Sequence, residues 1–131
     1  MGLTEKRLAA TIQTDALPKF ISEIQEVAAY PIAVTIDWET FIAYDSYPLS
    51  RLENYVFNDV KEAIGKICSD AIGKEALQEN VTTIHIRNTD QQDNFSMELK
   101  DKTLFLTERL YGDTFSNHMT NMIVDYLESV L

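Results

Sequence analysis

The spacing of hydrophobic residues changes along this chain, and that change limits the folds it can adopt. In four segments apolar residues recur every three or four positions, which places them on one face of an α-helix. In four others they alternate with polar residues, which is typical of a half-buried strand. The predicted order is helix, helix, strand, helix, strand, strand, strand, helix. Helices packed on one face of a four-stranded sheet bury all of these apolar faces at once, so we expect one α+β domain over residues 1–131.

The ends of the predicted helices follow from local signals. Pro18 is tolerated in the first turn of a helix but not in the middle of one, which predicts two N-terminal helices, 4–15 and 18–29. The longest helix begins at the capping-box pattern "SRLE" (50–53) and ends at Gly73. Asp113 caps a C-terminal helix.

The predicted sheet is mixed and mostly antiparallel. Its strands are expected at 32–42, 81–87, 95–100 and 103–108. Short connections predict that the last three strands are antiparallel neighbours joined by hairpins. The long helix returns the chain, so the first strand should lie parallel to a later one through a right-handed crossover. The second face of the sheet is expected to face water.

The chain is strongly acidic. Asp and Glu total 21 against 11 Lys and Arg, for a formal net charge of −10. Nucleic-acid binding depends on neutralising phosphates with basic side chains, and an anionic membrane repels an acidic surface. We therefore expect neither nucleic acid nor membrane as a partner, and we expect a neutral or basic one.

Cysteine usage and the N-terminus indicate a reducing compartment. Cys68 is the single cysteine, so no intramolecular disulfide and no multi-cysteine zinc site can form. The N-terminal residues lack the apolar run of a signal peptide, and no apolar stretch approaches the length of a membrane span. The expected location is the cytoplasm.

The stretch "AVTIDWETF" (33–41) carries two acids beside the only tryptophan. If it is a strand, Trp38 shares one face with the aliphatic residues, and Asp37, Glu39 and Phe41 share the other. Burial of an unpaired charge costs several kcal/mol, so the register with the carboxylates in water is favoured. His85 is expected on the same open face. Successive same-face residues lie about 7 Å apart, which does not favour a metal site.

Signatures of catalysis are absent from the sequence. Its four glycines, at positions 2, 65, 73 and 112, form neither a phosphate-binding loop nor a nucleophile elbow. We expect no cofactor and no metal, we assign no catalytic residue, and we favour a function other than catalysis.

The segment 20–60 holds seven acids and one base, together with several aromatic residues. Aromatic anchors with an acidic rim are typical of a surface that binds a basic protein. The sequence therefore predicts a small interaction protein, such as an adaptor, an inhibitor or an immunity-type protein. The candidate binding residues are Asp37, Glu39, Phe41, Tyr44, Asp45, Tyr47 and His85.

Three alternatives stay open at this point. A small-ligand-binding protein or enzyme would use a groove between sheet and helices, with Asp37, Glu39, His85 or Asp113 as polar groups. An acidic mimic of nucleic acid would compete with DNA for a basic protein. Self-association through an exposed last strand would give a homo-oligomer.

Overall fold

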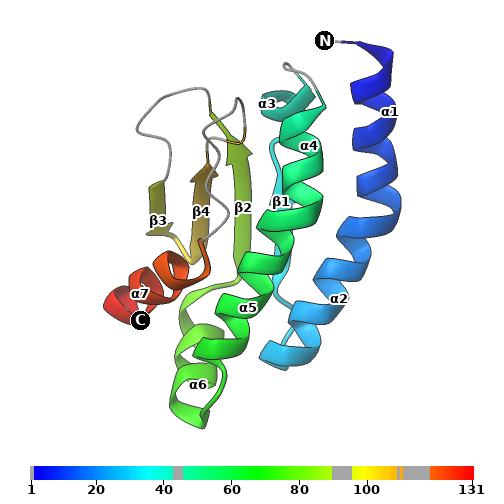
Figure 1. Ribbon diagram of the computed structural model, residues 1–131. Coiled ribbons are helices and arrows are strands. Elements are labelled where there is room, and N and C mark those ends of the chain that lie inside the picture. The colour runs from blue at the N-terminus through cyan, green and yellow to red at the C-terminus, as the bar shows by residue number, and fades with distance from the viewer. Residues whose placement is uncertain (1, 43–45, 90–95, 109, 111–118) are drawn as a thin grey trace.

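The computed structural model describes residues 2–42, 46–89, 96–108, 110 and 119–131 (Figure 1). A four-stranded sheet is covered by helices, with α5 lying in front of the sheet in Figure 1 and α1 and α2 beside it. The α+β class with a mixed four-stranded sheet is thus confirmed. None of the described helices is long and apolar enough to cross a lipid bilayer.

The described elements have these bounds. The helical ones are α1 (Leu3–Thr11), the π-helical turn η1 (Ile12–Ala16), α2 (Leu17–Ala28), α3 (Glu39–Ile42), α4 (Tyr47–Arg51), the π-helical turn η2 (Leu52–Val56), α5 (Phe57–Ile67), α6 (Ala71–Asn80) and α7 (Thr120–Val130). The strands are β1 (Ala33–Ile36), β2 (Thr83–Asn88), β3 (Ser96–Lys100) and β4 (Thr103–Glu108).

The strands lie side by side in the order β1-β2-β4-β3. β1 pairs parallel with β2, as expected for the strand that precedes the long helix. β2 also pairs parallel with β4, and β3 is antiparallel to β4. The prediction of a mostly antiparallel sheet is therefore wrong. After β2 the chain passes to the outer position, so β4 returns beside β2 in the same direction.

The β3–β4 connection is the tight hairpin that the sequence predicts. Asp101 and Lys102 form its turn with φ values of 52° and 61°. Positive φ at both central residues is typical of a type I′ turn, whose twist matches that of the strands. The Lys102 carbonyl accepts a hydrogen bond from the Thr82 amide at 2.8 Å, which joins the turn to the start of β2.

The N-terminal helices are continuous, because the π-helical turn η1 joins them without a gap. The amide of Leu17 donates to the Ile12 carbonyl, five residues back. Pro18 then lies in the first turn of α2, as expected. The prediction of two separate helices is corrected on this point.

The middle of the chain departs further from the sequence-based prediction. Ser50 lies inside α4, which follows Ser46, so the predicted capping box does not begin the helix. Gly73 lies in the first turn of α6, where Asp70 caps the helix by accepting a hydrogen bond from the Gly73 amide at 2.7 Å. A second helix therefore occupies the stretch that was predicted as the end of one helix and a turn.

The first strand is shorter than predicted. β1 ends at Ile36, and the Asp37 carbonyl accepts hydrogen bonds from the Thr40 amide at 3.1 Å and its hydroxyl at 2.7 Å. These bonds turn the chain into α3. Trp38, Phe41 and Ile42 have the i, i+3, i+4 spacing of one helical face. In a strand the same residues would lie on both faces, and the sequence pattern alone does not decide between helix and strand.

One face of the sheet faces the helices and the other is open. The inward residues of the two central strands, Ile84, Ile86, Leu104 and Leu106, are buried in one core with apolar residues of α2, α5 and α7. The outward residues of the strands are exposed or half-buried. At the β3 edge, the Leu99 amide donates to the Tyr126 hydroxyl of α7 at 2.8 Å. The prediction of helices on one face agrees with this arrangement.

Candidate functional site

The predicted binding residues that the structure describes lie on several different elements. Asp37 follows β1 and is half-buried, and Glu39 is exposed at the start of α3. Neither is part of a strand, so the predicted row of outward carboxylates on β1 is corrected. In the part of the chain that the structure describes, no three His, Cys, Asp or Glu side chains are grouped as metal ligands.

His85 lies on the open face as predicted. Its Nδ1 is 2.7 Å from the Thr35 hydroxyl, across the parallel pair of β1 and β2. On its other side the imidazole meets the ring of Phe105 edge-on, with 5.7 Å between ring centroids. The open face therefore carries a row of side chains in mutual contact, Thr35, His85 and Phe105.

The aromatic candidates differ in exposure. Phe41 was predicted to point outward, but it is 0% exposed, because α3 turns its ring into the core. Tyr47 is 58% exposed, and its ring lies 5.4 Å from the Arg51 guanidinium carbon. Tyr44 and Asp45 lie outside the described residues.

A groove between α2 and α5 is a better candidate for binding. Its volume is about 520 Å³. We call it the interhelical groove, and its lining residues are Asp15, Ala16, Lys19, Phe20, Glu23, Glu53, Asn54, Phe57, Asn58 and Lys61. At its base the rings of Phe20 and Phe57 stack with 4.5 Å between centroids and 9° between planes.

Both π-helical turns line this groove. η1 contributes Asp15 and Ala16, and η2 contributes Glu53 and Asn54. A π-helical turn inserts an extra residue into a helix, and such turns occur frequently at functional sites. The two π-helical turns lie on opposite walls of the groove, so the backbone as well as the side chains determines its shape.

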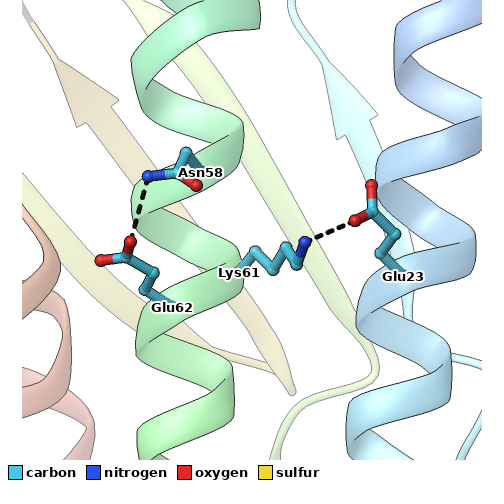
Figure 2. Close-up of polar contacts among 4 residues, drawn as sticks. All are labelled: Glu23, Asn58, Lys61 and Glu62. Carbon is cyan, nitrogen blue, oxygen red and sulfur yellow. Dashed lines mark hydrogen bonds and ion pairs between the residues drawn. The ribbon is translucent and has the colours of Figure 1, made fainter.

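Charges on the groove are mixed, with acids in excess. The Lys61 ammonium bridges α5 to α2 by donating to Glu23 Oε2 at 2.5 Å, as Figure 2 shows. This hydrogen bond lowers the pKa of the Glu23 carboxyl. Along α5, Asn58 donates to Glu62 at 3.2 Å (Figure 2). Asp15 and Glu53 are exposed, so the rim keeps carboxylates that a basic partner can meet.

A second polar feature lies at the carboxyl end of β4. Glu108 is 1% exposed, and neither carboxyl oxygen has a hydrogen-bond partner among the described residues. Burial raises the pKa of Glu108 from its ordinary value of 4.5 to about 8, with a further contribution from the charge of Asp59. Asp59 of α5 is itself 6% exposed, and its carboxylate lies 3.3 Å from the Thr120 hydroxyl.

Beside Glu108, the end of β2 carries a satisfied polar network. Asn88, which is paired with Glu108 in the sheet, donates from its side chain to the Thr40 carbonyl at 2.9 Å. Its side-chain oxygen accepts from the Leu110 amide at 2.8 Å. Arg51 donates to the Leu110 carbonyl at 2.9 Å. This network joins the ends of β2 and β4 to α3 and α4.

Sequence reasoning missed these features, although signals for two of them were present. In β2 and β4 the buried alternation runs on to Asn88 and Glu108, so polar residues stand in core register. In the N-terminal helices Ile12, half-buried Ala16 and Phe20 keep ordinary four-residue spacing, so the apolar stripe does not mark η1. The buried residues around η2 follow ordinary helical spacing as well.

Comparison of the chain with protein-family models, with curated proteins and with solved structures finds no match in any of the three.

Proposed function

We propose that this protein is a small interaction module that binds a basic partner protein through the interhelical groove and its acidic rim. The observation that carries the proposal is the groove itself, with π-helical turns on both walls and exposed carboxylates at Asp15 and Glu53. The proposal assigns the protein to the cytoplasm, since a lone free thiol such as Cys68 is typical of a reducing compartment.

Neighbouring side chains support binding of a protein rather than a small ion. Tyr55 is 39% exposed in η2, two residues from Glu53, and Tyr47 is exposed one helix earlier. Tyrosine and arginine are enriched among residues that dominate binding energy at interfaces. The net charge of −10 attracts a basic partner over a distance and speeds its association.

The test is capture of partners from the native lysate on immobilised protein, with elution by a salt gradient. The groove variant carries Asp15→Lys and Glu53→Lys. A matched control carries Glu75→Lys and Glu79→Lys on α6, which are exposed and change the net charge equally. We expect wild type and control to retain a basic protein that the groove variant loses. Equal retention by all three would overturn the assignment of the groove.

A further inference from the structure

The end of β4 holds an ionisable group in a place that does not suit its charged form. Both carboxyl oxygens of Glu108 are buried, and no described residue donates a hydrogen bond to either of them. A buried carboxylate without a partner is costly, and the usual response is that the group keeps its proton. Asp59, also buried, adds a like charge that acts against ionisation of Glu108.

Two hydrogen bonds hold the backbone around this side chain. The Glu108 carbonyl accepts from the Thr89 amide at 3.0 Å. Two residues later, the Leu110 amide donates to the Asn88 side chain at 2.8 Å. Displacement of the Glu108 side chain from the core therefore strains two specific amides, one at the end of β2 and one just after β4.

We propose that Glu108 is a proton-binding switch: with its proton the carboxyl ends of β2 and β4 stay closed, and without it the charged side chain leaves the core and opens this end of the sheet. The proposal concerns the helix-covered face of the sheet and does not depend on the interhelical groove.

Charged and polar groups lie around the switch on several described elements. From α5, Asp59 repels a Glu108 carboxylate, and the neighbouring Glu62 shares the Thr120 hydroxyl with Asp59 at 3.2 Å. From α4, the Arg51 guanidinium donates to the Leu110 carbonyl. From β2, the paired residue Asn88 is uncharged. Asp59 is the group whose charge contributes to the raised pKa of Glu108.

The direction of the pH effect follows from the raised pKa. Glu108 ionises near 4.5 in the unfolded chain and near 8 in the folded one. The contribution of Glu108 to the free energy of unfolding is therefore complete below pH 4.5. It is lost as pH rises to about 8, and above that pH it changes no further. Within that window the unfolding equilibrium of wild type shifts roughly tenfold per pH unit relative to a variant that lacks the carboxyl.

The experiment combines carboxyl NMR titration with amide exchange from pH 5 to 9.5 on the full chain. Variants are Glu108→Gln and Glu108→Leu, the second in case the buried amide of the first prevents folding. The control is Glu98→Gln, an exposed glutamate of β3. Protection of the Thr89 and Leu110 amides is compared with that of mid-strand amides in β2, after correction for intrinsic exchange.

We expect Glu108 to titrate near pH 8, and the Thr89 and Leu110 amides to lose protection as pH rises toward that value in wild type and control. Mid-strand amides stay better protected than these two at every pH, and both Glu108 variants lack the pH-dependent loss. A Glu108 titration near pH 4.5, or the same pH profile in wild type and Glu108→Leu, would overturn the proposal.

Discussion

Asn88 and Glu108 occupy paired positions in the sheet and both are buried, yet their chemistry differs. The amide of Asn88 both donates and accepts, so it satisfies the Thr40 carbonyl and the Leu110 amide together. An ionised carboxylate only accepts, and no donor meets it here. Both residues continue the alternation of buried positions in their strands, so the sequence predicts that both are buried. The alternation does not predict which of the two makes hydrogen bonds.

Gly73 has a structural role that differs from the one predicted from the sequence. It was predicted to end a helix, whereas its role is to let α5 and α6 approach. A Cβ at Gly73 would lie 1.9 Å from the Ile67 carbonyl oxygen. That distance is far below contact, so backbone must shift to accommodate any side chain.

Gly73→Ala should therefore destabilise the protein by about 1–3 kcal/mol, the usual cost of overpacking. Gly65→Ala is the matched control, because nothing lies within 4 Å of a Cβ there and alanine favours the helix by about 1 kcal/mol. Denaturant unfolding measures both. Equal stability of the two alanine variants would contradict the close approach of α5 and α6.

At the scale of elements, η1 reconciles a proline with a continuous helix. In an α-helix the ring of Pro18 would clash with the carbonyl four residues back. The π-helical turn shifts the apolar stripe by one residue, so that Ile12 and Leu17 both reach the core. The sequence contained the proline, but a helix break and a π-helical turn explain a proline equally well without coordinates.

Deletion of Thr14 tests this explanation. The deletion regularises the stripe to α-helical spacing but leaves Pro18 inside an α-helix, which costs about 3 kcal/mol. Addition of Pro18→Ala should recover most of that loss. Stability measured by urea unfolding, with Pro18→Ala alone as the control, decides the point. If the deletion alone is as stable as the double variant, the proline does not explain the turn.

At the scale of the whole molecule, the sequence predicted the fold class but not the strand order. The four strands and the open face follow from apolar periodicity. After β2 the next strand can pair with β2 as a hairpin, or it can leave a position that a later strand fills. Apolar alternation within each strand is the same in both cases, so it does not decide the strand order. Asp37, Glu39 and Phe41 were assigned to a long first strand because their segment fits a strand as well as a helix. The groove formed by helices distant in sequence was not predicted.

Site-specific photocrosslinking decides whether a basic protein binds at the interhelical groove, as we propose. A photoreactive residue replaces Asn54, which is exposed on the groove wall in η2, or Glu79, which is exposed on α6 as a control. Irradiation in the native lysate should attach a basic protein at position 54 and not at position 79. Crosslinking at neither position, or equally at both, would contradict the claim.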